Sequence, residues 1–281
     1  MEFDLENPLA NFEEHQNCTI SQLFASESDH MLSPNSLALT HSHVLFRCEA
    51  VSLILQVQFS CNLDPFVTYL AINFLHRFMS RQEIPCSELQ QGKPWLLRHV
   101  AISCLSLASK MKNVSLSLSD IQNQGCVLEA QCVHRMELLI LGALNWRMRS
   151  ITPFPFLNFF LSLAEFKDQA LNETLKERAS EIIFNAQNDI KLLEYKPSTI
   201  AASALMYASH ELLSPPQYSI LRASNAACEY LDEDTLSKCF KLIQKIVMME
   251  AKDSMVYTTT SFLSSETPMS VLERSIKRQR I

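Results

Sequence analysis

The chain has 281 residues, of which 47% are hydrophobic and 19% charged, and its formal net charge is −6. It contains only three isolated glycines, where average usage would give about 20. This excludes a P-loop and a dinucleotide fingerprint and argues against many tight β-hairpins. The acidic balance disfavours a nucleic-acid groove as the main function. We therefore expect an all-α protein, with enough apolar residues for one large domain or two small ones.

The first region, residues 1–40, is polar, punctuated by proline and without any Lys or Arg. We expect a largely disordered acidic tail with at most one short helix. The nine cysteines of the chain are scattered and form no CxxC pair, which favours free thiols and a reducing compartment. No ligand set for a metal is visible, so we expect no metal and no cofactor. Apolar runs stop short of the ~20 residues that a membrane span needs, so we expect no membrane contact.

The second region, residues 41–150, shows helical periodicity from its start. Asp64 followed by Pro65 marks one helix start, because Asp caps free N–H groups and Pro suits the first helical position. The pattern predicts five helices, over residues 44–57, 66–79, 95–111, about 120–124, and 129–144.

The third region, residues 151–252, predicts a second set of five helices, over residues 154–166, 171–193, 199–213, 217–223 and 232–251. In both sets the third helix is rich in Ala, Ser and Leu, which indicates an internal repeat with a buried central helix. Residues 253–281 are Ser/Thr-rich and end in a basic tip, so we expect a mobile tail. The tip is either a solvated end or a patch for nuclear import or anion binding.

Long, ordered segments of both regions resemble a known family. The runs DPFVTYLAINFLHRFMS (64–80), PWLLRHVAISCLSLASKM (94–111) and RMELLILGALNWRMRSITPFPFLNFFL (135–161) resemble the first box of plant D-type cyclins. The run KPSTIAASAL (196–205) resembles the third helix of their second box. The resemblance implies two tandem five-helix cyclin boxes and a non-catalytic role. That role is to bind and activate a cyclin-dependent protein kinase, which promotes the G1/S transition and cell division.

Two charged residues stand on otherwise apolar helices. Lys110 ends the helix over 95–111, and Glu137 lies on the apolar face of the helix over 129–144. A half-buried charge needs a partner, because leaving it uncompensated costs several kcal/mol. One interpretation is an internal Lys110–Glu137 ion pair that only joins two helices. The resemblance implies instead that both residues bond to the kinase, near its regulatory helix.

Four apolar residues flank these charges, and for each of them core packing is the alternative to kinase binding. The resemblance makes them kinase-binding candidates: Leu107, Met111, Leu141 and Leu144.

The chain departs from the family at several positions. The family pairs the residue matching Arg47 with an Asp, but this chain has His76, a neutral acceptor without compensating charge. Arg47 could equally pair with Glu49, with Glu83 or with nothing. His99 replaces an apolar residue, and residues 112–113 (Lys-Asn) replace residues that are usually acidic.

A substrate-docking patch is implied on the first helix, with matching positions at Phe46, Ala50, Leu53 and Arg98. Here Leu53 replaces the family's Trp and Arg98 its Gln, so a large anchor is lost and a cation that repels basic peptides is gained. The resemblance also implies kinase inhibitors as partners.

Further partner and modification sites come from short motifs. An N-terminal LxCxE, which docks to retinoblastoma-type pocket proteins, is absent, which suggests a divergent class. Residues 84–88 (IPCSE) are a weak match that chance explains as well. Ser33 and Thr267 precede proline in the expected tails and are phosphorylation candidates. As a cell-cycle regulator, the protein is expected in the nucleus and cytoplasm.

Three other functions remain as alternatives. The first is a cyclin-fold adaptor that binds a kinase or transcription factor without activating it. The second is an α-helical enzyme, against which the lack of a nucleophile–base pair or carboxylate dyad argues. The third is a nucleic-acid binder of the TFIIB type, which would need a basic face that this sequence does not show.

Overall fold

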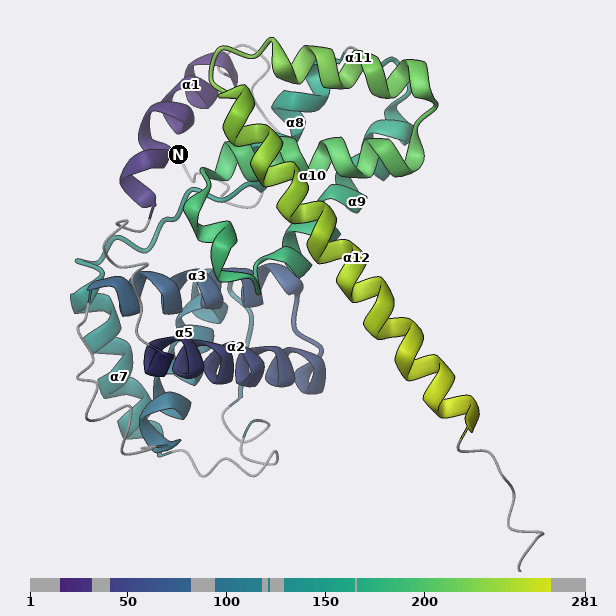
Figure 1. The fold of residues 1–281 in the computed structure, drawn as a ribbon. Coiled ribbons are helices and arrows are strands. Elements are labelled where there is room, and N and C mark those ends of the chain that lie inside the picture. The colour runs from purple at the N-terminus through teal and green to yellow at the C-terminus, as the bar shows by residue number, and fades with distance from the viewer. Residues whose placement is uncertain are drawn as a thin grey trace, which may run out of the picture.

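The computed structural model describes residues 16–31, 41–81, 94–117, 121, 129–164 and 166–263, and the regular elements in these ranges are all helical. Two helical bundles lie one above the other, and the last helix runs out from the upper one (Figure 1). The all-α prediction with two tandem bundles is therefore confirmed.

The first bundle is built around a central helix, α5 (Pro94–Met111). Among the described residues it packs against three further helices, which are α2 (His41–Cys61), α3 (Pro65–Arg81) and α7 (Ala130–Ala143). Asp64 accepts a hydrogen bond from the backbone N–H of Phe66 and Pro65 begins α3, as predicted. Of the helix predicted near 120–124, only Ile121 is described, and it is helical and buried.

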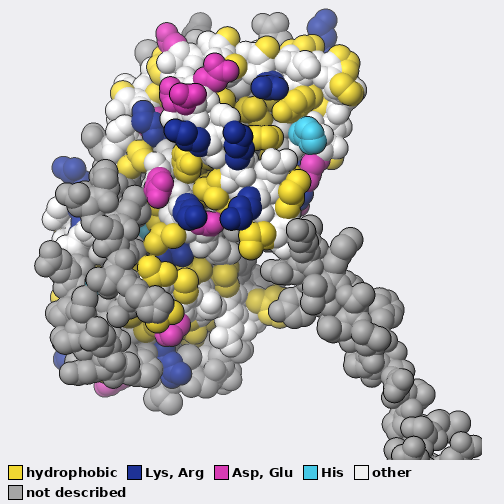
Figure 2. All heavy atoms as spheres, viewed as in Figure 1, with side chains coloured by type: hydrophobic (Ala, Val, Ile, Leu, Met, Phe, Trp, Pro, Cys, Tyr) yellow, Lys and Arg dark blue, Asp and Glu magenta, His cyan; other side chains and the backbone are white. Residues whose placement is uncertain are grey.

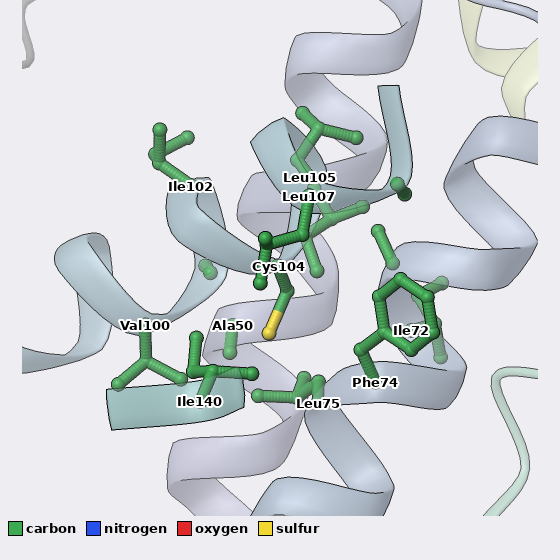
Figure 3. Packing of buried hydrophobic residues seen from close by; sticks show 14 of the residues in the cluster. Ala50, Ile72, Phe74, Leu75, Val100, Ile102, Cys104, Leu105, Leu107 and Ile140 are labelled. Atoms are coloured by element: carbon green, nitrogen blue, oxygen red, sulfur yellow. The ribbon is translucent and has the colours of Figure 1, made fainter. Parts of the chain in front are cut away.

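Apolar side chains from all four helices meet in one core (Figure 3). The core explains why α5 is apolar almost all round, since helices cover most of its surface. Figure 3 labels its members Ala50, Ile72, Phe74, Leu75, Val100, Ile102, Cys104, Leu105, Leu107 and Ile140.

The second bundle repeats this plan around α10 (Pro197–Leu212), in which every residue from Ser198 to Ser209 is buried. Its small Ala and Ser side chains let neighbouring helices approach closely. The surrounding elements are α8 (Phe154–Leu163), α9 (Gln169–Ala186), the short 3₁₀ helix η3 (Ile190–Glu194), α11 (Pro215–Ala226) and α12 (Glu233–Leu263).

Two helices of the second bundle end at other residues than the sequence predicts. The helix predicted over 171–193 ends at Ala186, and a turn separates it from η3, where Asp189 caps the backbone N–H of Lys191. The last helix continues to Leu263 instead of 251, so the start of the predicted tail is helical. The basic tip lies outside the described residues.

Within the expected N-terminal tail, residues 16–31 are described, and they contain one short α-helix, as the sequence allowed. They form α1 (Gln16–Ser26) and the 3₁₀ helix η1 (Glu27–His30). Phe24 stacks on Tyr230 with ring centroids 4.2 Å apart and also contacts Phe156. The buried Glu27 carboxylate accepts hydrogen bonds from the backbone N–H and hydroxyl of Ser198, at 3.0 and 2.9 Å. The Glu27 contacts attach the segment to the start of α10, and the Phe24 contacts attach it to α8 and to the loop before α12.

Within α2, residues 43–61 are long and apolar enough to cross a membrane by length and composition alone. This differs from the prediction, which counted its charged residues as interruptions. In the fold one face of α2 packs in the first core, and the guanidinium of Arg47 is buried against protein groups. A core helix of this kind meets the same length and composition criteria as a membrane span.

Candidate protein-binding site

Lys110 and Glu137 form an ion pair between α5 and α7. The ammonium nitrogen of Lys110 lies 2.6 Å and 2.7 Å from the two carboxylate oxygens of Glu137. The lysine side chain is 61% exposed, whereas that of Glu137 is 5% exposed. The internal pair that the sequence left as one interpretation is therefore present, but its lysine end remains open to solvent.

The Glu137 carboxylate is held ionised by its neighbours. Burial would raise the pKa of Glu137, but hydrogen bonds from Lys110, Ser106 and His134 and the charge of Lys110 together lower it. The imidazole of His134 adds a contact to the carboxylate at 3.5 Å. Because Lys carries three N–H donors and two meet the carboxylate, one donor of Lys110 remains for another acceptor.

Large apolar side chains are exposed beside this pair. Leu138 and Leu139 follow Glu137 on α7 and are 45% and 61% exposed, and Trp146 in the next turn is 67% exposed. Exposed apolar groups beside a polar centre mark interaction surfaces. We call Lys110, Met111, Glu137, Leu138, Leu141 and Trp146 the α5–α7 face.

The sequence reasoning missed Leu138 and Trp146, although a signal was available. The buried positions of α7 are Val133, Met136, Glu137 and Ile140, which lie on one stripe. Leu138 falls off that stripe, and an apolar residue off the buried stripe of an amphipathic helix is a candidate for partner contact.

The four flanking residues predicted for kinase binding divide into two pairs. Met111 and Leu141 are half-buried and lie at the surface. Leu144 is fully buried and Leu107 nearly so, and both belong to the first core. Leu144 and Leu107 are therefore packing residues of the first core, the alternative that the sequence left open, and their part in kinase binding stays a prediction.

Trp146 is held outward by an unusual backbone. Asn145 and Trp146 have φ values of 52° and 58°, in the left-handed region. This conformation suits Asn but costs a bulky residue about 1–2 kcal/mol. The N–H of Trp146 bonds to the carbonyl of Leu141 at 2.9 Å, which closes the C-terminal end of α7. Such strain is common at functional sites.

Arg47 and His76 form a buried link, one of the pairings left open by the sequence. The Arg47 Nε donates to His76 Nε2 at 2.8 Å. Its other nitrogens donate to the carbonyls of Asn188 at 3.0 Å and Gln187 at 3.3 Å, in the turn after α9. Burial, followed by the Arg47 charge, lowers the pKa of His76 well below its usual value, so His76 is neutral. Arg47 thus joins the two bundles.

The predicted docking patch is only partly at the surface. Phe46 and Ala50 are buried in the first core, and their part in a docking patch stays a prediction. Leu53 is half-buried and Arg98 is exposed. Phe46, Ala50 and Leu53 follow the i, i+4, i+7 spacing of one face of α2, and Leu53 packs against the edge of the first core. Arg98 lies on α5.

Several predictions lie outside the described residues. These are the phosphorylation candidates Ser33 and Thr267, the 84–88 motif, and Glu83 as a partner of Arg47. In the part of the chain that the structure describes, no group of three or more His, Cys, Asp or Glu residues is placed to hold a metal ion.

Comparisons with known proteins address the family. The sequence model described as "Cyclin, N-terminal domain" matches residues 19–149, and that described as "Cyclin, C-terminal domain" matches residues 151–272. The putative cyclin-D6-1 of Arabidopsis thaliana is 39% identical over an alignment of 264 residues, gaps included, that covers 87% of this chain and 83% of that protein. Cyclin-D6-1 of Oryza sativa subsp. japonica is 34% identical over an alignment of 277 residues, gaps included, that covers 96% of this chain and 81% of that protein.

Solved structures share the fold. A viral cyclin from herpesvirus saimiri superposes with a TM-score of 0.64 at 18% identity, covering 82% of this chain and 96% of that chain. A chain of the CAK complex of Chaetomium thermophilum bound to ATP-gamma-S gives 0.54 at 17% identity, covering 82% and 72%. A chain of the yeast RNA Pol II CTD kinase CTDK-1 complex gives 0.50 at 15% identity, covering 79% and 70%. The chain therefore belongs to the cyclin family of non-catalytic regulatory proteins, and its similarity within that family is to the D-type cyclins of plants.

Proposed function

We propose that this cyclin binds and activates a cyclin-dependent Ser/Thr protein kinase and thereby promotes the G1/S transition. The observation that carries the proposal is the α5–α7 face, where an open Lys110–Glu137 pair lies among exposed apolar side chains on two packed helices. Family membership supports the partner class, and two chains with the same fold are named as parts of kinase complexes.

The face suits a rigid partner helix. Its apolar residues provide contact area, while the ion pair supplies one polar centre whose charges already cancel. The remaining N–H donor of Lys110 would meet a backbone carbonyl of the kinase, which fixes the register of docking.

Activation follows from the chemistry of protein kinases. Phosphoryl transfer requires a Lys–Glu ion pair between a kinase strand and the kinase's C-helix. A cyclin that binds the kinase better with this helix turned inward shifts the population towards the active state. A shift from 1:99 to 99:1 needs a preference of about 5.5 kcal/mol. The surface offered by Leu138, Leu141 and Trp146 can supply much of this if it becomes buried.

The test removes the polar centre and leaves the apolar residues of the first core in place. The double variant Lys110→Ala/Glu137→Ala is expected to lose binding to the kinase, which is first identified by affinity capture and mass spectrometry. The matched control is Arg178→Ala/Glu211→Ala, which removes an ion pair of 2.7 Å in the second bundle. Both variants should melt cooperatively. Full kinase binding by the first variant, or equal loss by the control, contradicts the proposal.

A cyclin-fold adaptor that binds without activating is a second candidate. Two departures from the family favour it: the neutral His76 beside Arg47, and Lys112, whose ammonium lies 4.2 Å from the ring centre of Phe66 near the junction of the two bundles. A reconstituted assay separates the candidates, since binding without stimulated phosphate transfer selects the adaptor. We also propose that the protein acts in the nucleus and cytoplasm, which imaging of a tagged chain tests.

A further inference from the structure

The outer side of α12 carries a stripe of basic and apolar residues. Its buried side consists of Leu236, Cys239 and Ile243, which pack in the second core. The opposite side carries exposed residues at helical spacing. We call them the lysine stripe: Lys238, Lys241, Lys245, Met248 and Met249.

The lysine stripe makes no close ion pair within the described residues, although Lys238 attracts the carboxylate of Asp232 at longer range. None of its three lysines has an ion-pair partner within 4.0 Å there, in contrast to Lys196, which lies 3.8 Å from Glu27. Figure 2 shows Lys and Arg side chains with hydrophobic side chains and some Asp and Glu side chains between them on the face along which α12 runs. A surface of this composition fits a segment that combines carboxylates with apolar side chains.

The chain contains such a segment at its own start. Residues 1–15 carry five carboxylates and no Lys or Arg, and these alternate with apolar residues. The carboxylates are Glu2, Asp4, Glu6, Glu13 and Glu14, and the apolar residues include Phe3, Leu5, Leu9 and Phe12.

The segment also begins within reach of the stripe. It leads directly into α1, which is attached beside the start of α12 by the stacking of Phe24 on Tyr230. Fifteen residues span up to about 50 Å when extended. The stripe from Lys238 to Met249 is only about 16 Å long at 1.5 Å per residue. Tethering makes the contact intramolecular, so that weak pairs suffice.

From these observations we propose that residues 1–15 dock along the lysine stripe of α12 in the same chain. The carboxylates pair with the lysines, and Phe or Leu side chains cover Met248 and Met249. The segment then shields a surface that would otherwise attract acidic partners. This interaction is separate from the α5–α7 face, so its failure leaves the proposed kinase-binding function untouched.

The first test is zero-length carbodiimide coupling of the full chain at low concentration, which joins a carboxylate to a lysine in direct contact. We expect links between residues 1–15 and the lysine stripe, located by mass spectrometry, and their loss in about 1 M salt. A mixture of isotopically light and heavy chains distinguishes links within one chain from links between copies. Links only between copies, or no links from residues 1–15, overturn the proposal.

The second test measures how accessible the segment is. Lys241→Glu/Lys245→Glu leaves the buried side of α12 intact and is expected to speed cleavage after Glu13 or Glu14 by a Glu-specific protease about fivefold, as two lost exposed ion pairs imply. The control Lys167→Glu/Arg222→Glu changes two exposed cations elsewhere by the same charge and should leave the rate unchanged. Equal rates in both variants and the wild type overturn the proposal.

Discussion

Arg47 of the first bundle donates through Nε to His76 Nε2 at 2.8 Å, while its remaining nitrogens hold two carbonyls of the second bundle. A neutral imidazole thus accepts the bond from Arg47, and one guanidinium serves both helix packing and the junction between bundles. The arrangement requires His76 Nε2 to be unprotonated, since it accepts the bond.

His76 should make stability depend on pH. Its folded pKa is lowered well below 6.5, first by burial and then by Arg47, so the unfolded state binds more protons below pH 6.5. Stability is therefore fully present above about pH 6.5 and falls with decreasing pH, by at most about 1.4 kcal/mol per pH unit. Urea unfolding between about pH 5 and 7.5 measures this slope.

The variant His76→Gln identifies the source of that slope. Its amide oxygen can accept from Arg47 but does not titrate, so we expect a flatter profile. His210→Gln, at an exposed histidine, should keep the wild-type slope. His76→Ala leaves a buried donor of Arg47 unpaired and should cost about 1–3 kcal/mol at pH 7. An unchanged slope in His76→Gln contradicts the assignment.

Trp146→Gly should separate folding from binding. Glycine adopts the left-handed conformation and so relieves a strain of about 1–2 kcal/mol. Against this gain, its greater freedom in the unfolded chain lowers the stability of the folded protein by about 0.4–1 kcal/mol. The melting temperature is therefore expected to stay level or rise. Affinity for the kinase should fall about tenfold or more, because an exposed Trp at an interface is a typical hot spot.

A second tryptophan provides the control for this measurement. Trp95→Ala removes an exposed ring at the opposite end of α5 from Lys110 and should leave kinase affinity unchanged. If Trp146→Gly binds the purified kinase with wild-type affinity in a titration, Trp146 does not take part in kinase binding.

Glu27 should anchor the N-terminal helix mainly as a hydrogen-bond acceptor. Glu27→Ala leaves the buried N–H of Ser198 without its partner and should destabilise the protein by about 1–2 kcal/mol. Amide hydrogen exchange should show that α1 loses protection first. Glu27→Gln keeps an acceptor oxygen and is the matched control, expected to retain that protection.

The same residue predicts a pH effect of opposite sign to that of His76. Burial raises the folded pKa of Glu27 above 4.5, although hydrogen bonds from Ser198 and the charge of Lys196 oppose this. Its contribution to stability is therefore present below pH 4.5 and lost as pH rises through the folded pKa. Glu27→Gln should consequently be at least as stable as the wild type at pH 7. A clear loss of stability there would show that the charge itself is required.

Gly142→Ala should stabilise the protein. Gly142 lies in α7, and a Cβ built at this position meets no atom within 4 Å. Alanine is favoured over glycine in a helix interior by about 1 kcal/mol, less near an end. The urea midpoint is expected to rise, whereas Ala143→Gly should lower it. A fall in the midpoint for Gly142→Ala would show that the helix end needs the freedom of glycine.

Local signals in the sequence were sufficient for most helices. Asp64 and Pro65 marked the start of α3, and the apolar run to Met111 marked the end of α5. The composition of α10 predicted a buried central helix, as found. These features depend on propensity, capping and periodicity, which act over a few residues and can be read along the chain.

Other features were decided only by tertiary contacts. The amphipathic pattern of residues 171–193 spans positions 187 and 188, but α9 ends at Ala186, before both of them. The backbone carbonyls of Gln187 and Asn188 accept hydrogen bonds from Arg47, which lies some 140 residues earlier. Likewise, Phe24 stacks on Tyr230 beside the start of α12, and Glu27 accepts a hydrogen bond from Ser198 on α10. Periodicity marks Leu138 as lying off the buried stripe of α7, but only the folded chain shows that no other segment of the described residues covers it.

The amino-acid sequence alone thus determined the all-α class, the repeated five-helix plan and the pairing of Lys110 with Glu137 as one of two open interpretations. The folded chain decided which end of that pair faces solvent, which apolar residues surround it and how Arg47 joins the bundles. The physical reason is distance along the chain: helix signals act between neighbours, whereas burial and long-range hydrogen bonds depend on segments that only folding brings together.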